Sequence, residues 1–434
     1  MSEAIKPVED SETIKPAEDN LEEINIFDQE LMKCPHAFYK KLRDEAPVYQ
    51  DPNTGIFQVS KHELICEAAR NAKVFSNDFG ALQKDGGSDV YPKEAAEIME
   101  KDGYPAVNTM LTADPPRHTK YRGLVNKAFT PKRVSDMGPE IEKKTNFIID
   151  QFIDNGKCEV ASQLAQPLPI RVIAEALGAS TDDYEFFKIS SQAFTDQLSG
   201  TSTPDEHIEI AKKLVKFQQY FAERLKEKEK NPTDDILSDL ATLEFEDEDG
   251  ILRKMETPEQ LSIIQQLLVA GNATTAHSIT EAIKLLIENP DQMDLVINDH
   301  SLVPNMIEES LRLLTPTNNM WRIATEDTEL GGVVIPAGSA LLLRYGSGNR
   351  DEGLFENPDK FDVTRQNARR HIAFGQGIHV CLGMNLSRKE MYTAFPIILD
   401  RLKNMRFSED NDFNYSPNVL LRGLDNLNIE FDNA

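Results

Sequence analysis

Helical spacing of apolar positions dominates the chain from about residue 35 onward. The longest such pattern opens with Thr257-Pro258-Glu259-Gln260, a capping box with proline at the first helical position, and no breaker follows before Asn289-Pro290. We expect one helix over 258–288, which at 1.5 Å per residue would be roughly 46 Å long. A helix of that length can cross an entire domain.

Two shorter helices have recognisable ends. Asp114-Pro115-Pro116 supplies a cap and a proline in the first turn, which predicts a helix over about 115–128. A second helix is predicted over about 304–314 and is stopped by Thr315-Pro316.

Strand patterns are short and few. Val48–Gln50 and Phe57–Ser60 flank a turn at 51–55, which predicts a hairpin, and another strand pair brackets Ile335–Gly338 with Leu341–Leu343 following. Residues 78–112 have no sustained period, and we expect a long loop with a short helix around 93–101. Long irregular loops in compact domains are usually functional. The chain is therefore predicted to be mainly α (α+β), with a small β-rich region.

Charge narrows the possible partners. The 434 residues include 47 Lys and Arg against 73 Asp and Glu, a net charge of −26. Such acidity argues against nucleic acid and against anionic membrane surfaces. No stretch approaches the ~18 apolar residues of a membrane span, and no secretory signal is recognisable, so we expect a cytoplasmic protein. The length suits one large domain with subdomains or two domains.

The first 24 residues differ from the rest. They hold two copies of one hexapeptide pattern, Ile5–Asp10 and Ile14–Asp19, without aromatic residues. Residues 1–30 contain two lysines and ten acidic residues, a net charge of −8. We expect residues 1–24 to be a disordered acidic tail, with a partner-binding motif as the alternative, and residues 25–434 to be the folded part.

Four scattered cysteines form no CxxC pair, so neither a disulfide framework nor a zinc site is indicated. Cys381 differs from the other three because it lies in Phe374–Gly383, where three glycines let a loop wrap around it just before a helical pattern. Backbone amides that point at the sulfur would stabilise a thiolate. The loop is thus suited to present a thiolate to a metal.

This loop resembles the haem-binding loop of the cytochrome P450 family at every diagnostic position. The resemblance implies the P450 fold, a haem domain over 25–434, and haem b (iron protoporphyrin IX) with Cys381 as the axial ligand of its iron. A thiolate ligand favours cleavage of the O–O bond of bound dioxygen. Thr130-Pro131 and Gly348–Asp351 look like soluble bacterial monooxygenases of this family.

Further residues match the family at its spacing, although each one alone would be unremarkable. Glu309 and Arg312 in one helix, with Arg365 downstream, resemble the family's buried Glu-Arg-Arg network, whose role is structural. Four residues match positions that hold the haem propionates: His118, Arg122, Arg322 and His379.

The middle of the long helix carries Ala270-Gly-Asn-Ala-Thr-Thr275, whose Gly, Asn and Thr are poor helix formers, so we expect a local opening. Thr274 matches the family's threonine that hydrogen-bonds to iron-bound dioxygen and helps deliver protons. The preceding residue is usually acidic, but this chain has Ala273. Either ordered water with Thr275 or Asn272 replaces the acid, or dioxygen is not split in the usual way.

We expect the wall of the substrate pocket on the face of the long helix that carries Thr274, one and two turns before that residue. A further part is expected in the segment that follows the helix predicted over 304–314. The residues are Gln266, Val269, Ala270 and Met320, although Met320 could equally belong to the core. Walls of this kind suit an apolar small molecule. The sequence does not identify the substrate.

The resemblance implies a monooxygenase that inserts one oxygen atom from O2 into an apolar substrate. No flavin, dinucleotide or iron–sulfur motif is present, so a ferredoxin-type redox partner is expected to supply the electrons. It would dock on a local basic patch, unless these charges are simply scattered and solvated. The basic residues are Lys120, Lys127, Lys132, Arg133, Arg369, Arg370, Arg388 and Lys389. The alternatives are a P450-type nitric-oxide reductase, a peroxide-using haem enzyme and a non-catalytic haem sensor.

Overall fold

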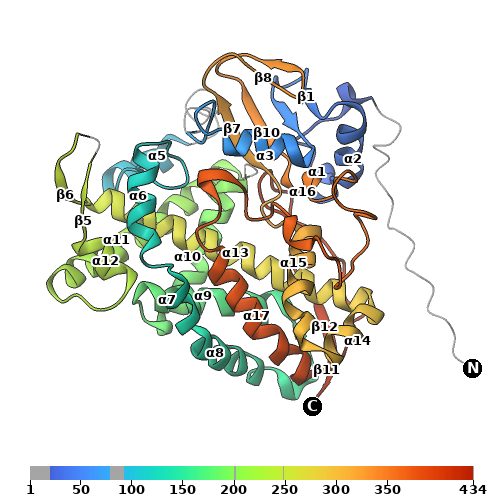
Figure 1. Ribbon diagram of the computed structural model, residues 1–434. Helices are drawn as coiled ribbons and strands as arrows, with labels where there is room; N and C mark the ends of the chain where they lie inside the picture. The colour runs from blue at the N-terminus through green and yellow to red at the C-terminus, as the bar shows by residue number, and fades with distance from the viewer. Residues whose placement is uncertain (1–19, 79–91, 200–201, 248, 434) are drawn as a thin grey trace, which may run out of the picture.

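The protein is seen in a computed structural model that describes residues 20–78, 92–199, 202–247 and 249–433. Most of the molecule is a helical body, and the larger sheet lies at one end of it (Figure 1). This confirms the predicted mainly helical class. The longer helices are α8 (Gly138–Asp150), α9 (Pro167–Leu177), α10 (Tyr184–Ser199), α11 (Pro204–Lys230), α13 (Thr257–Glu288), α15 (Val303–Leu314) and α17 (Met384–Arg401).

Shorter helices cover the ends of this body and the edge of the sheet. They are α1 (Gln29–Lys33), α2 (His36–Glu45), α3 (His62–Arg70), α5 (Lys93–Asp102), α6 (Arg117–Asn126), α7 (Pro131–Asp136), α12 (Ile236–Thr242), α14 (Pro290–Asn298) and α16 (Tyr345–Gly348). The short helix expected inside the long loop is confirmed as α5. Part of that loop, residues 79–91, lies outside the described residues.

The largest sheet has the strand order β1-β2-β10-β7-β3. Its strands are β1 (Val48–Gln50), β2 (Phe57–Val59), β3 (Phe75–Ser76), β7 (Met320–Ala324) and β10 (Ala340–Leu343). The predicted hairpin is confirmed, because β1 and β2 pair antiparallel with Val48 opposite Val59. The strands on either side of Pro336 do not pair with each other. β9 (Val333–Ile335) pairs with β8 (Thr328–Leu330), whereas β10 pairs with β7 and β2.

Besides the β8-β9 pair, two further small sheets hold the remaining strands of the described residues. One has the order β11-β12-β4, and the other is the hairpin β5-β6. The strands are β4 (Lys157–Glu159), β5 (Glu244–Glu246), β6 (Leu252–Lys254), β11 (Leu402–Phe407) and β12 (Asn428–Asn433).

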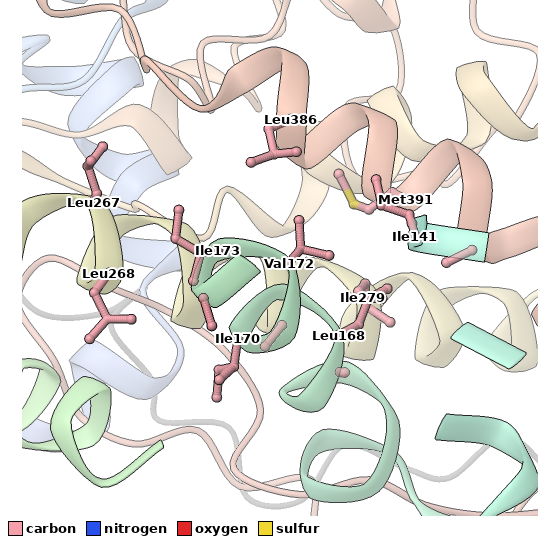
Figure 2. Packing of buried hydrophobic residues seen from close by; sticks show 14 of the residues in the cluster. Ile141, Leu168, Ile170, Val172, Ile173, Leu267, Leu268, Ile279, Leu386 and Met391 are labelled. Atoms are coloured by element: carbon pink, nitrogen blue, oxygen red, sulfur yellow. The ribbon is translucent and has the colours of Figure 1, made fainter. Parts of the chain in front are cut away.

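The predicted long helix is confirmed as α13, which passes through the middle of the molecule (Figure 1). Its capping box lies one residue earlier than expected, because the Glu256 amide donates to the Glu259 carboxylate at 2.6 Å. The main hydrophobic cluster surrounds α13, and Figure 2 shows side chains from α8, α9, α13 and α17 packed together in it. α13 therefore provides a rigid reference for any site beside it.

The start of α6 corrects the predicted cap. The helix begins at Arg117, and the Asp114 carboxylate does not cap it. That carboxylate instead accepts from the Ser76 hydroxyl and, at 3.0 Å, from the Asn77 amide. Asp114 therefore ties the end of β3 to the segment before α6, a choice of partner that the local sequence does not reveal.

The predicted tail cannot be compared in full, because residues 1–19 lie outside the described residues. Leu21–Glu23 form a short 3-10 helix, and Ile24 is buried in a cluster with Phe38 and Leu42 of α2. At least these last residues of the predicted tail therefore belong to the folded part. In the part of the chain that the structure describes, no helix has the length and apolarity required to cross a bilayer.

Candidate functional site

Cys381 lies in a tight loop directly before α17. Gly377 has a φ of +76°, and an added Cβ there would collide with the Ala69 carbonyl of α3, so only glycine fits. The Cys381 amide donates to the Phe374 carbonyl at 2.8 Å, which closes the loop. The sequence therefore fixes the position of the thiol through local backbone geometry.

The surroundings of the Cys381 sulfur act on its pKa in opposite directions. Burial raises the pKa, whereas the Gly383 and Met384 amides and the Arg122 and Arg388 guanidinium groups lower it, and the net shift is upward. The favourable groups are donors and positive charges, which a thiolate needs once a metal replaces its proton.

Four predicted residues converge beside this loop. The rings of His118 from α6 and His379 have centroids 4.3 Å apart. Arg322 of β7 is 1% exposed, and its charge acts on His379. Arg122 of α6 donates to the Val380 carbonyl at 2.7 Å. We call His118, Arg122, Arg322 and His379 the cationic cradle.

The cradle is short of hydrogen-bond partners. Both ring nitrogens of His118, Nε2 of His379 and Nε of Arg322 are buried without a partner among the described residues. Burial lowers the pKa of both histidines, and that of His379 falls to about 3. Buried donors without partners are rare in folded proteins, so these nitrogens indicate a missing acceptor. The two propionate carboxylates of haem b fit this donor set.

The middle of α13 is unusual. Most of the helix is buried, yet Ala270 is exposed, and a Cβ on Gly271 would meet open space. Thr274 is half-buried, and its hydroxyl donates to the Ala270 carbonyl at 2.7 Å. We call the space beside Ala270, Gly271 and Thr274 the hollow.

The predicted opening of α13 at this point is wrong, because the helix runs unbroken from Thr257 to Glu288. The Thr274 hydroxyl does bond to the preceding turn, but without interrupting the helix. Thr275 lies on the neighbouring face, where its hydroxyl donates to Ser387 of α17 at 3.1 Å. Ala273 offers no polar side chain to the hollow.

The predicted substrate wall divides into two parts. Ala270 is exposed and Val269 half-buried, as a wall requires. Gln266 instead fastens the loop before α6, since its amide nitrogen donates to Thr109 at 2.8 Å and its oxygen accepts from the Leu111 amide at 3.1 Å. Met320 is half-buried and packs against the core of the larger sheet.

The predicted Glu-Arg-Arg network is assembled. Glu309 and Arg312 of α15 are fully buried and bonded at 2.7 and 2.8 Å, and Arg365 donates to Glu309 at 2.8 Å. Backbone carbonyls of Asn349 and Pro358 accept from Arg312. Each charged group therefore has a partner, which a buried ion pair requires.

Sequence reasoning missed a second buried network beside the first. Glu308 of α15 accepts from Arg388 and Tyr392 of α17 and contacts the His371 ring at 3.0 Å. Burial alone would raise the pKa of Glu308, but these partners hold it well below its ordinary value. The network clamps the segment before the cysteine loop to two helices. The sequence signal that could have revealed this network was the pair of adjacent glutamates at 308 and 309.

The predicted basic patch is smaller than expected. Arg388 is committed to Glu308, Arg133 pairs with Asp234 and Asp239, and Lys120 donates to the Asp247 carbonyl. Five members have no recorded ion pair in the described part of the chain and are exposed or half-buried: Lys127, Lys132, Arg369, Arg370 and Lys389.

Comparison with known proteins agrees with this geometry. The model of the family described as Cytochrome P450 matches residues 80–422. Cytochrome P450 107B1 of Saccharopolyspora erythraea is 33% identical over 409 residues, covering 93% of this chain and 96% of that protein. The 6-deoxyerythronolide B hydroxylase of the same organism is 34% identical, covering 91% and 95%. A solved structure of cytochrome P450 CREJ in complex with (4-ethylphenyl) dihydrogen phosphate has a TM-score of 0.86 at 27% identity, covering 95% and 100%.

Proposed function

The chain belongs to the cytochrome P450 family and is a P450 monooxygenase, and from this premise we propose that it holds haem b between Cys381 and the hollow of α13. The observation that carries this proposal is the cationic cradle, because buried donors without acceptors call for the carboxylates of a bound group. His118, Arg122, Arg322 and His379 would hold the propionates. Cys381 would be the iron ligand.

When bound, haem supplies the oxidising chemistry, which the protein only orients and shields. Cys381 would hold the group at the loop before α17. The Thr274 hydroxyl, which donates to the Ala270 carbonyl beside the hollow, could hold or pass a proton at Oγ1. Val269 and Ala270 offer an apolar surface, which supports an apolar small-molecule substrate that receives one oxygen atom from O2.

Electrons are proposed to come from an acidic ferredoxin that docks on Lys127, Lys132, Arg369, Arg370 and Lys389. Charge complementarity would steer the encounter, since these positive residues lie on a protein with a net charge of −26.

Haem ligation can be tested by the spectrum of the reduced CO complex. The wild-type protein should show the long-wavelength band of thiolate ligation, and Cys381→His should lose it while retaining haem. Cys66→Ala is the matched control, because that thiol is also buried yet lies on α3. An unchanged spectrum in Cys381→His would reject the assigned ligand.

Electron supply separates the alternatives. A monooxygenase of the proposed kind should be reduced only with ferredoxin and its reductase present. Stopped-flow reduction by NADH or NADPH alone would favour the nitric-oxide reductase, and hydroxylation driven by peroxide would favour the peroxide-using enzyme. Substrate binding without turnover would favour a sensor.

To test the docking patch, the substituted residues must be cations that have no ion pair within the protein. Lys127→Glu with Lys132→Glu should slow ferredoxin-supported reduction by roughly tenfold or more at low salt. Arg133→Glu is unsuitable, because it would set a carboxylate against Asp234 and Asp239. Lys216→Glu with Lys226→Glu makes the same charge change at two exposed lysines of α11 that have no ion pair among the described residues, and it should have little effect. Equal slowing in both double variants would contradict a local patch.

A further inference from the structure

A small cavity lies between three segments that are far apart in the sequence: residues 26–39, the residues next to β7 and β10, and residues 418–422. It leaves about 10 Å³ for the centre of a water-sized occupant, so it has room for one water molecule or one monatomic ion. Half of its lining is apolar, and no carboxylate of the described residues belongs to it. The polar lining residues are Tyr39, Asn318, Asn319, Arg344, Asn418 and Arg422.

Both arginines of this lining are buried without a carboxylate partner. Arg344 is 5% exposed and Arg422 is 8% exposed, and neither has an ion pair among the described residues. Nε of Arg344 donates to Gln58 at 2.8 Å, and Nε of Arg422 donates to the Lys33 carbonyl at 3.3 Å. A guanidinium group has five N–H donors, so the terminal N–H groups of both arginines can serve a further acceptor.

Aromatic rings hold the two guanidinium groups in place. Arg422 lies over the Tyr415 ring, 3.8 Å from its centroid, and Arg344 lies 5.9 and 5.8 Å from the ring centroids of Phe38 and Tyr39. A ring contacts the flat face of a guanidinium group, whereas the N–H donors point outward in its plane. The rings therefore fix both groups and leave donors available to a ligand between them.

The nearby carboxylates are used by other groups. Asp51 acts on the charge of Arg344, but its oxygens accept from the Asn53 amide and the Thr54 hydroxyl. Arg422 is linked to a carboxylate through Tyr415, whose hydroxyl is bonded to Glu281 at 2.9 and 3.0 Å. Neither carboxylate neutralises the arginine by direct contact.

A neighbouring histidine reports a positive field at the same place. His36 begins α2 directly after Pro35, which lines the cavity, and its buried Nδ1 has no partner among the described residues. Burial lowers the pKa of His36 well below its ordinary value, and the charges of Arg350 and Arg422 act in the same direction. An anion here would be attracted by charges beyond those it touches.

We propose that this cavity binds one small monovalent anion of the size of chloride. The terminal N–H groups of Arg344 and Arg422 would hold it, with Nδ2 of Asn418 as a neutral donor. Oδ1 of Asn418 is occupied by the Leu420 and Leu421 amides at 2.8 and 2.9 Å, which leaves its amide nitrogen for the ligand. A water molecule could accept from the same donors but would not compensate two buried positive charges.

The anion would tie the three segments together. The Leu420 carbonyl already accepts from the Asn318 amide at 2.7 Å and from the Asn319 amide at 3.2 Å, just before β7. Arg344 follows β10, which pairs with β7, and Arg422 reaches Lys33 at the end of α1. Binding would therefore stabilise the folded chain at the edge of the larger sheet, and it has no part in the chemistry at Cys381.

Thermal unfolding of the holoprotein tests the site, with chloride exchanged for gluconate at constant ionic strength. The unfolding midpoint should rise by about 1–2 °C as chloride increases to about 100 mM and should then level off, because the anion binds only the folded chain. Arg344→Met and Arg422→Met should each lose most of this rise. Arg406→Met is the matched control, since this exposed arginine pairs with Glu430 and Asp432, and it should keep the rise.

Two results would overturn the proposal in this experiment. One is a wild-type midpoint that does not depend on chloride at constant ionic strength. The other is a chloride-dependent rise that persists in full in both Arg344→Met and Arg422→Met.

Anomalous diffraction provides a direct test that needs no variant to fold. Crystals of the holoprotein soaked in bromide should show an anomalous peak between Arg344, Arg422 and Asn418. A bromide peak absent from this place, with ordinary water density in the cavity, would overturn the proposal. The CO spectrum should be the same with and without chloride, so the outcome is independent of haem ligation.

Discussion

Two clusters of buried basic side chains in this protein differ in how they are paired. In the first, Arg312 and Arg365 surround the Glu309 carboxylate, with backbone carbonyls taking the remaining donors. In the second, the charge of Arg322 acts on His379, and both ring nitrogens of His118, Nε2 of His379 and Nε of Arg322 have no partner among the described residues. The first cluster is complete within the chain, whereas the second is completed by something the chain does not contain.

This difference separates a structural network from a binding site. A buried charge is tolerated when its partner folds with it, and the Glu309 network meets that condition. The cradle does not meet it, so the free-energy cost of burying its positive charges is offset only when an anionic group binds. Both clusters consist of ordinary residue types, and only their pairing distinguishes them.

The largest effect is expected at the complete network. Glu309→Gln would leave Arg312 and Arg365 buried without a counter-charge and should lower the free energy of unfolding by about 3–5 kcal/mol. Denaturant unfolding of the holoprotein measures this. Asp44→Asn, which breaks an exposed pair with Lys40, should leave the free energy of unfolding almost unchanged. Similar losses in the two variants would mean that burial does not determine the cost.

The cradle should respond in the opposite sense when haem is absent. Arg322→Met removes a buried cation, so haem should leave the holoprotein about tenfold faster, as measured by transfer to apomyoglobin. The haem-free chain should keep its stability or gain about 1 kcal/mol, since an unpaired group has been removed. A loss of stability in the haem-free chain as large as for Glu309→Gln would show that Arg322 is paired within the protein.

The two clusters show a buried charge that is paired within the chain and one that is not. His277 on α13 illustrates a third case, in which the buried group becomes neutral instead of finding a partner. Burial lowers the pKa of His277 to about 4, against the opposing charges of Asp425 and Glu281. Because the unfolded chain binds this proton near pH 6.5 and the folded one only near pH 4, stability is present above pH 6.5 and is lost as the pH falls. His277→Gln should remove up to about 3 kcal/mol of that loss between pH 6.5 and 4. Unfolding curves at several pH values measure it, and parallel pH profiles would contradict the assignment.

A modest effect is expected where pairing is complete but half-exposed. Gln266→Leu removes two hydrogen bonds that fasten Thr109 and Leu111 to α13, which should destabilise the closed loop by about 1–2 kcal/mol. Amide hydrogen exchange at residues 104–112 should quicken accordingly. Gln151→Leu, whose side chain bonds only to its own helix, is the control. Unchanged hydrogen exchange in Gln266→Leu would mean that Gln266 does not fasten this loop, and would favour the original assignment of Gln266 to the substrate wall.

Local sequence signals predicted the elements that depend on near neighbours. The helix over 258–288 and the end of α15 at Leu314 follow from prolines and caps that act within a few residues. The cap at Asp114 was wrong because a better set of donors, Ser76 and Asn77, comes from almost forty residues away. The opening expected in α13 was wrong because the helix stays continuous across Gly271 and Thr274.

The same division applies to the candidate site. The resemblance to the cytochrome P450 family identified the members of the cationic cradle and of the Glu309 network, and the structure brings each set together. The basic patch was overestimated, because Arg133 and Arg388 find carboxylates on distant helices. The cavity lined by Arg344 and Arg422 was not recognised, since an arginine usually faces solvent.

The sequence by itself determined the cysteine loop and therefore the family. Gly375 and Gly377 adopt the positive φ angles that the loop around Cys381 requires, and at Gly377 the close approach of α3 excludes any larger residue as well. Only the tertiary structure decided which charges are paired. Arg388 became a structural residue, Arg322 stayed without an acceptor at Nε, and Arg344 and Arg422 were buried without an ion pair among the described residues, because each outcome depends on helices and strands far away in the chain.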